Sequence, residues 1–145
     1  MLKKKIALAC DHAGFSHKEK TKEYLQNKGY QTNDYGCFSE ESVDYPDFAH
    51  QLADSIKNEI NGIGIQFCGT GNGINMSANK HAEIRAALCW NPHIAEQARL
   101  HNNANVLTMP ARHLGWNEVK EIIDVFLSSD FEGGRHQRRV SKISI

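Results

Sequence analysis

The sequence predicts an α/β domain of three layers, in which helices cover both faces of a five-stranded, mostly parallel sheet. Short apolar segments alternate with stretches of helical periodicity along the 145 residues, which is typical of parallel strands joined by helices. Segments 62–68 and 84–89 are apolar almost throughout, as expected of strands covered on both faces. These observations predict a single Rossmann-like α/β/α domain over residues 1–145, with a C-terminal helical extension over residues 130–145.

The predicted strands are the short apolar runs that lie between the helical stretches. A single sequence does not determine their order in the sheet. They are expected at residues 5–10, 30–36, 62–68, 84–89 and 104–109.

Helices are expected between these strands. Residues 45–60 carry the clearest apolar stripe at helical spacing, and residues 116–127 carry a second. Residues 15–28 have helical propensity but are heavily charged, so this helix is expected at the surface. Two further helices are expected, one starting near Ile74 and one with Pro92 in its first turn.

The charge balance argues against a nucleic-acid or membrane partner. Seventeen basic and seventeen acidic residues cancel, whereas such partners usually require a basic excess. The first apolar run ends at Asp11 and His12, which indicates a strand rather than a signal peptide. No apolar run approaches the roughly 20 residues of a membrane span. We therefore expect a cytoplasmic protein.

The four cysteines are scattered along the chain, with no C-x-x-C pair and no zinc-site spacing. In a reducing compartment a disulfide framework is not expected. Three of the four end apolar runs, where a free cysteine commonly serves as a small core residue. The cysteines are Cys10, Cys37, Cys68 and Cys89.

Polar residues follow several of the predicted strands. Ligands of such sheets bind beyond the carboxyl ends of the strands, so we expect these residues to converge on one crevice. They are Asp11 and His12 after the first strand, Cys68 and the loop Gly69, Thr70, Gly71, Asn72 and Gly73 after the third, His101 and Asn102 beyond the fourth and its helix, and Arg112 after the fifth.

The loop at residues 69–73 (GTGNG) suits an anion. Its glycines allow left-handed backbone angles that bring N–H groups together, and a helix N-terminus adds partial positive charge. The loop could bind a phosphate or an oxyanion formed during a reaction, although a tight turn without a ligand is the alternative. It matches neither the P-loop nor the dinucleotide-binding pattern. Cys68, directly before it, would gain thiolate character and could act as nucleophile or base.

The C-terminal segment contains a cluster of arginines. Arg135 and Arg139 are four residues apart and share one face of a helix, which Arg138 also approaches. Guanidinium groups at this spacing suit a phosphate. A solvated basic tail is the alternative interpretation.

The histidines give no metal-binding pattern. A site made of Asp11, His12 and His101 is conceivable, but no spacing supports it, so no metal is expected. His113 and His136 are interpreted as chance placements.

Five motifs together resemble the type B ribose-5-phosphate isomerases of the ribose/galactose isomerase family. This resemblance covers essentially the whole chain and implies interconversion of ribose 5-phosphate and ribulose 5-phosphate through an enediolate, as in the pentose phosphate pathway, without metal or cofactor. The motifs are CDHAG (10–14), DYPDFA (44–49), CGTGNGINMSANK (68–80), HNNANVL (101–107) and EGGRHQRRV (132–140).

The resemblance also implies roles for individual residues. Cys68 would be the base that moves a carbon-bound proton, and Ile74, where some relatives have a glutamate base, cannot replace it. His101, assisted by Asp11, would open the sugar ring. The remaining implied roles are enediolate stabilisation by Gly69, Thr70, Gly71, Asn72 and Gly73, phosphate binding by His12, Arg135 and Arg139 with Arg112 as a further candidate, and lining of the sugar pocket by Tyr45 and Asn102.

Family members of this kind supply the ring-opening histidine and the tail arginines across a dimer interface, which implies at least a homodimer and leaves a homotetramer open. Activity on allose 6-phosphate or galactose 6-phosphate is an alternative, although the GGRH tail favours a five-carbon substrate. Two further functions stay open: a non-catalytic phosphosugar-binding module, and a hydrolase or transferase with Cys68 as covalent nucleophile.

Overall fold

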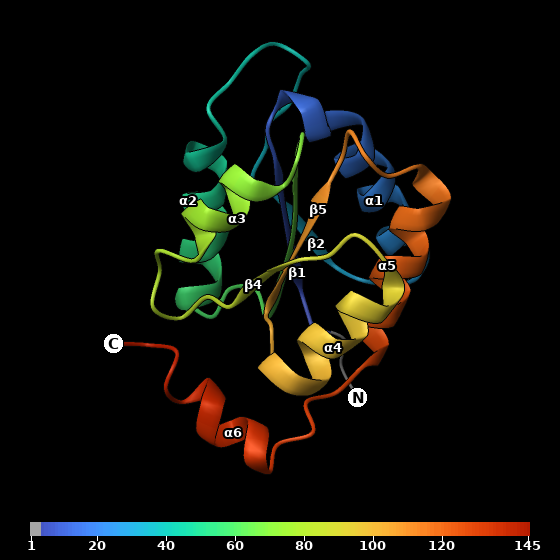
Figure 1. Ribbon diagram of the computed structural model, residues 1–145. Coiled ribbons are helices and arrows are strands. Elements are labelled where there is room, and N and C mark those ends of the chain that lie inside the picture. The colour runs from blue at the N-terminus through green and yellow to red at the C-terminus, as the bar shows by residue number, and fades with distance from the viewer. Residues whose placement is uncertain (1–3) are drawn as a thin grey trace.

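Five parallel strands form one sheet in the order β2-β1-β3-β5-β4 (Figure 1). The computed structural model describes residues 4–145, and within them every strand pair is parallel. The predicted fold class is confirmed. The strands are β1 (Ile6–Cys10), β2 (Thr32–Asp34), β3 (Ile63–Cys68), β4 (Ala86–Leu88) and β5 (Val106–Pro110).

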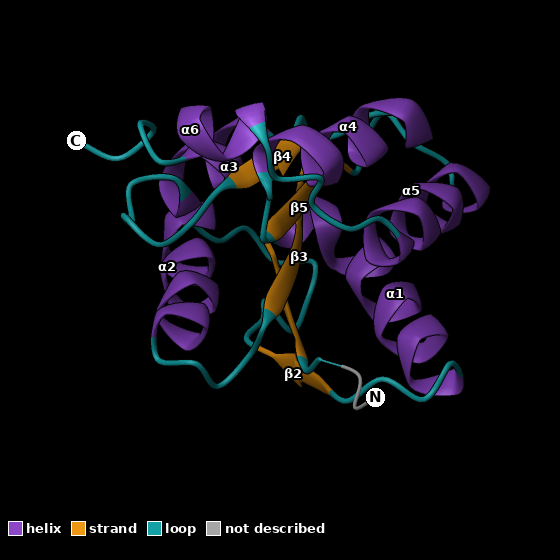
Figure 2. Ribbon diagram, turned by 90° about the horizontal axis from the view of Figure 1, so that it is seen from below, coloured by secondary structure: helices purple, strands orange, loops and turns teal. Residues whose placement is uncertain are grey.

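Helices cover both faces of the sheet, as Figure 2 shows. One face packs against α1 (Phe15–Asn27), α4 (Pro92–Asn102) and α5 (Trp116–Ser128), and the other against α2 (Tyr45–Lys57) and α3 (Asn72–Ala78). A short 3₁₀ helix (His12–Gly14) follows β1, and α6 (Arg135–Val140) lies beside α4. None of these helices is long and apolar enough to cross a membrane.

The end of α2 differs from the prediction, which extended this helix to about residue 60. The helix stops at Lys57, and Glu59 takes a left-handed conformation with φ of 59°. The Ile60 N–H donates to the Ser55 carbonyl and the Glu59 N–H to the Ile56 carbonyl, which is the Schellman arrangement that ends many helices. Glycine usually occupies the left-handed position, so a glutamate there gave no stop signal in the sequence.

The position of β4 also differs from the prediction. Its apolar sequence suggested a strand covered on both faces, but β4 is an edge strand that pairs only with β5, and its three residues are half-buried. The outer side of this apolar strand is therefore a candidate surface for contact with another chain.

Lys18 on α1 is fully buried, although this helix was expected to be a charged surface helix. Its ammonium group pairs with Asp34 at the end of β2 and with Glu19. Asp34 also accepts hydrogen bonds from Lys22 and from the backbone N–H of Gly36. The network ties α1 to the edge strand β2 and to the loop that follows it.

Asp34→Asn is expected to lower the free energy of unfolding by about 3 kcal/mol, because it removes the main partner of a buried charge while Glu19 remains. Urea unfolding at pH 7 measures this change. Glu19→Gln is the matched control and should change the free energy by less than about 1 kcal/mol, since Glu19 is more exposed. Equal effects of the two substitutions would show that the Lys18–Asp34 pair is not the dominant contact.

The same pair predicts a pH dependence. Burial alone would raise the pKa of Asp34, but hydrogen bonds from Lys18 and Lys22 keep the pKa below its usual value. A depressed folded-state pKa stabilises the protein above the unfolded value of about 3.9 and loses this effect as the pH falls. The free energy of unfolding should therefore decrease below about pH 4, and less steeply in Asp34→Asn.

Candidate active site

Asp11 and Cys68 lie next to each other at the carboxyl edge of the sheet. Cys10 and Phe67 are paired in the register of β1 and β3, so the residues that follow them leave the sheet side by side. Side chains alternate between the faces of a strand. Ala9 and Cys68 belong to the core cluster on the α2 and α3 side. Asp11, one residue beyond β1, keeps an extended backbone with φ of −94° and ψ of −172°, so the alternation continues and its side chain starts toward this side as well.

Asp11 is held by the chain around it. Its Oδ1 accepts hydrogen bonds from the backbone N–H groups of Ala13 and Gly14, at 2.9 and 3.2 Å. Its own N–H donates to the carbonyl of Phe67 on β3. The carboxylate thus caps the 3₁₀ helix and is fixed in orientation, with 7% of the residue exposed.

The thiol of Cys68 is nearly covered in the single chain, since only 4% of the residue is exposed. It lies at the edge of the apolar cluster between the sheet and helices α2 and α3, directly before the glycine loop. Two other cysteines are poor sources of a thiolate at neutral pH. Burial raises the pKa of Cys89 to about 12, and burial together with the neighbouring Cys37 raises that of Cys10 further.

The glycine loop turns sharply into α3, which begins at Asn72, two residues earlier than predicted. Gly71 has a φ of 79°, and a Cβ at this position would collide with Leu88 of β4. The Thr70 hydroxyl accepts a hydrogen bond from the Asn72 N–H at 3.2 Å. Gly71 has no side chain to cap α3, so the following amides of its first turn, those of Gly73 and Ile74, have no side-chain partner among residues 4–145.

Two large side chains pack against glycines of this loop. A Cβ at Gly69 would lie 2.9 Å from the guanidinium nitrogen Nη1 of Arg112, and a Cβ at Gly73 would collide with the ring of Tyr45. The Arg112 N–H also donates to the Gly69 carbonyl. Arg112 and Tyr45 therefore border the loop beside Cys68.

His12 follows Asp11 at the same edge. Its Nδ1 accepts a hydrogen bond from the backbone N–H of Val43, in the loop before α2. In a neutral imidazole this leaves the proton on Nε2, which can then donate to an anion.

Gln66 is a buried residue of the site that the sequence analysis did not single out. Its amide nitrogen donates to the carbonyl of Ile74 in α3 and to the hydroxyl of Thr108 on β5. It links two strands to the helix that follows the glycine loop. The sequence did contain an indication of this role, because Gln66 is a polar residue within an otherwise apolar strand.

The remaining predicted residues do not join this crevice within one chain. His101 and Asn102 end α4, and the chain then runs directly into β5. Asn102 lines an open groove of about 410 Å³ with Ile84, Arg85 and Ala104, which flank the amino ends of β4 and β5. The expectation of a single crevice is therefore wrong for the isolated chain. A helix that starts at the carboxyl edge of a parallel sheet returns the chain to the amino edge.

The tail arginines also lie away from Cys68. Arg135, Arg138 and Arg139 are exposed on α6, which packs on α4 and lies far from the loops after β1, β3 and β5 (Figure 1). The predicted site is thus divided between two edges of the molecule. The carboxyl edge carries Asp11, His12, Tyr45, Cys68, Gly69–Gly73 and Arg112, and the opposite edge carries His101, Asn102, Arg135 and Arg139.

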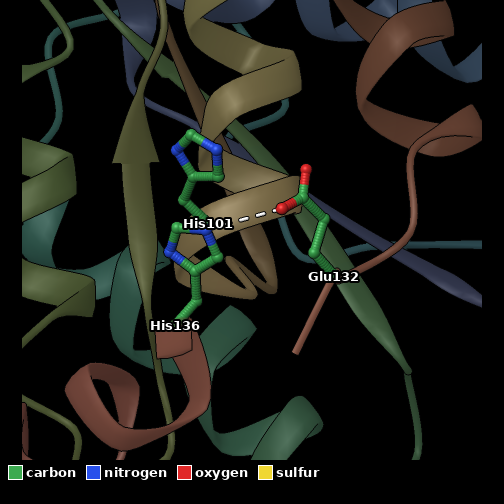
Figure 3. A group of neighbouring side chains, drawn as sticks. All are labelled: His101, Glu132 and His136. Carbon is green, nitrogen blue, oxygen red and sulfur yellow. Dashed lines mark ion pairs between the residues drawn. The ribbon is translucent and has the colours of Figure 1, made fainter. Parts of the chain in front are cut away.

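His101 has neighbours that the sequence analysis missed. Its ring stacks on that of His136 with centroids 4.3 Å apart, and the Glu132 carboxylate lies beside them (Figure 3). Burial, together with His101 and Arg135, lowers the pKa of His136 below its usual value. His136 is thus a buried partner of His101 rather than a chance surface histidine.

Comparison with known proteins gives consistent matches. Residues 6–143 match the ribose/galactose isomerase family. Ribose-5-phosphate isomerase B of Escherichia coli K12 is 44% identical over 142 residues, which make up 97% of this chain and 95% of that protein.

Solved structures agree with these matches. A ribose 5-phosphate isomerase from Thermotoga maritima has a TM-score of 0.97 at 50% identity, over 99% of both chains. Ribose-5-phosphate isomerase B from Mycoplasma genitalium, crystallised with bound ribulose-5-phosphate, has a TM-score of 0.91 at 43% identity, over 96% of this chain and 93% of that one. The fold, the family match and these relatives show that the chain belongs to the ribose/galactose isomerase family.

Proposed function

We propose that this chain is an aldose–ketose isomerase that interconverts ribose 5-phosphate and ribulose 5-phosphate. The observation that carries the proposal is the placement of Cys68 beside Asp11 and directly before the glycine loop. Relatives at 44% and 50% identity are ribose-5-phosphate isomerases, and the Mycoplasma genitalium structure contains the ketose product itself.

In the proposed chemical step, Cys68 acts as the base. As a thiolate it takes the proton from C2 of the open-chain aldose, and as a thiol it returns this proton to C1, while the proton of the C2 hydroxyl passes to the oxygen on C1. The electron pair of the broken C–H bond passes into an enediolate, whose charge then rests on oxygen. Backbone amides of the glycine loop and the Thr70 hydroxyl stabilise that charge, which is the usual function of fixed donors at a developing oxyanion.

Ring opening and phosphate binding are assigned to the remaining predicted residues. His101, assisted by Asp11, opens the furanose ring. His12 and the tail arginines bind the phosphate, and Arg112 is near enough to the loop to contribute. The exposed guanidinium groups of Arg135, Arg138 and Arg139 are equally available for this role.

We further propose that the active unit is at least a homodimer in which His101, Asn102 and the extension of residues 130–145 complete the partner's site. The division of the predicted residues between two edges of one chain supports this. So does the groove along the apolar edge strand β4, which Ile143 also lines with 54% of its surface exposed. A second copy is the partner that this surface would accept.

A cytoplasmic location is part of the proposal, since all four cysteines are free thiols, as is common in a reducing compartment. Comparing turnover of ribose 5-phosphate with that of allose 6-phosphate and galactose 6-phosphate measures the preference for a five-carbon substrate. We expect the pentose to be preferred.

Cys68→Ala should lower kcat by roughly 10²- to 10⁴-fold, the usual contribution of a general base. A coupled assay for ribulose 5-phosphate measures the rate. In D₂O the wild-type protein should introduce deuterium at C2 of ribose 5-phosphate. In the variant, the rate of deuterium incorporation should fall by the same factor as kcat. Near-normal turnover of Cys68→Ala would remove the proposed mechanism, and a persistent covalent sugar adduct in mass spectra would favour a nucleophilic cysteine.

Mixing two inactive variants tests the shared site. Cys68→Ala and His101→Ala are each expected to be nearly inactive, but their heterodimer contains one intact site if His101 serves the partner. Random pairing of equal amounts should restore about a quarter of wild-type activity, because about half of the dimers are mixed and each has one working site of two. Activity that stays at the level of the separate variants after refolding together would show that each site lies within one chain.

Gly73→Ala should fold normally but lower kcat/KM by roughly 3- to 10-fold, equivalent to the loss of one hydrogen bond. The new methyl group displaces the ring of Tyr45, which is 39% exposed and free to move outward. If the effect acts through Tyr45, adding Gly73→Ala to Tyr45→Ala should cause no further loss. Additive losses would show that Gly73 acts independently of the ring.

A further inference from the structure

His101, Glu132 and His136 form a compact group at the junction of α4 and α6 (Figure 3). Each offers one nitrogen or oxygen ligand atom, and these three atoms lie within 4.8 Å of one another. His136 Nε2 and the Glu132 carboxylate oxygen Oε2 are 3.5 Å apart. We call these three residues the histidine–glutamate cluster.

The backbone preorganises the histidine–glutamate cluster. The Glu132 N–H donates to the carbonyl of Leu100 at 3.1 Å, one residue before His101. Gly133 and Gly134 then adopt positive φ angles of 71° and 58°, which turn the chain so that α6 begins beside α4. The backbone thus brings the exposed carboxylate of Glu132 next to the two rings.

His136 carries an unmet polar group within this cluster. The residue is 7% exposed, and its Nε2 has no hydrogen-bond partner within residues 4–145. Leaving a buried polar atom unpaired is unfavourable by about 1–3 kcal/mol. The Glu132 carboxylate oxygen is 3.5 Å from this nitrogen, an ion-pair separation that provides no hydrogen bond, so an ion shared by the two groups would give the nitrogen a partner.

The chemistry of the cluster points to a transition-metal ion. Two imidazoles and one carboxylate are typical zinc ligands, and three protein ligands leave a fourth position for water. Ligand atoms about 2.0–2.1 Å from a tetrahedral ion are about 3.3 Å apart, close to the separation of His136 and Glu132. The His101 ring now stacks on His136 with an interplanar angle of 14°, so the two rings must tilt apart to direct their lone pairs at one ion.

We propose that the histidine–glutamate cluster binds Zn²⁺ or a similar divalent transition-metal ion, and that the bound ion withdraws His101 from catalysis. A metal-bound imidazole nitrogen cannot exchange a proton with the sugar. The bound ion would therefore inhibit the isomerase, and the isomerisation itself does not require it. The inhibition rests on the proposed function, whereas the binding does not.

Direct binding is tested with Co²⁺, whose visible absorption bands report tetrahedral coordination. The wild-type protein should bind one Co²⁺ per chain, with displacement by Zn²⁺. Loss of an outer-shell partner already weakens metal binding by roughly 10- to 100-fold, so Glu132→Gln and His136→Ala should each weaken it by at least as much. Glu132→Gln preserves the shape of the side chain and serves as the second variant should His136→Ala fail to fold.

His81→Ala is the matched control. His81 and His50 have ring nitrogens 2.7 Å apart, and Asp54 lies 3.9 Å from His81, so this exposed group is the alternative place for an ion to bind. The control variant should keep the wild-type Co²⁺ spectrum. Absence of the bands in wild type, or bands that survive in Glu132→Gln and disappear in His81→Ala, would overturn the proposal.

Inhibition is measured separately, as the ratio of isomerase activity with and without Zn²⁺ for each variant. Wild-type protein should be inhibited, with full recovery on adding a chelator, and Glu132→Gln should need at least tenfold more Zn²⁺, in line with its weaker binding. If Zn²⁺ inhibits Glu132→Gln and the wild-type protein equally, the inhibiting ion binds elsewhere. The Cys68 thiol would then be the expected ligand. The Co²⁺ titration decides on the binding site even if the chain proves not to be an isomerase.

Discussion

The direction of the parallel strands is the constraint on which the rest of this structure depends. Every strand ends at the same edge of the sheet, so Asp11, Cys68 and Arg112 leave β1, β3 and β5 as close neighbours. The same geometry sends each connecting helix back to the opposite edge. His101 ends such a helix, and no rearrangement of side chains can bring it to Cys68 of the same chain. The separation of the site into two parts is a result of topology.

That separation links catalysis to assembly. Under the proposed function, one edge of a chain supplies the base and the enediolate-binding loop, and the opposite edge supplies the ring-opening histidine and the phosphate-binding arginines. A monomer would then have two half-sites. The groove beside the apolar edge strand β4 is lined by Asn102 of the second group. An interface formed along this edge could therefore complete the site as the dimer assembles.

Much of the fold could be predicted from the sequence, because β1, β3, β4 and β5 carried apolar patterns and the longer helices carried a stripe or a cap, whereas β2 is polar. The family was identified from motifs whose residues are close in sequence, and the comparisons confirm it. The predictions failed where a residue contradicted its usual role. Glu59 takes a conformation typical of glycine, Lys18 is buried in an ion pair with Asp34, and β4 is apolar although it forms an edge. The contact of His136 with His101 depends on how α6 packs on α4, which no local pattern encodes.

The contact between Leu88 and Gly71 links the edge strand β4 to the glycine loop that follows Cys68. Leu88 belongs to the short outermost strand, yet its side chain supports the turn that aims the amides after Cys68. A larger or smaller residue at this position would therefore tilt the donors without touching a reactant. Under the proposed function, movement of β4 would therefore misalign the donors that stabilise the enediolate, and a contact that holds β4 in place would keep them aligned.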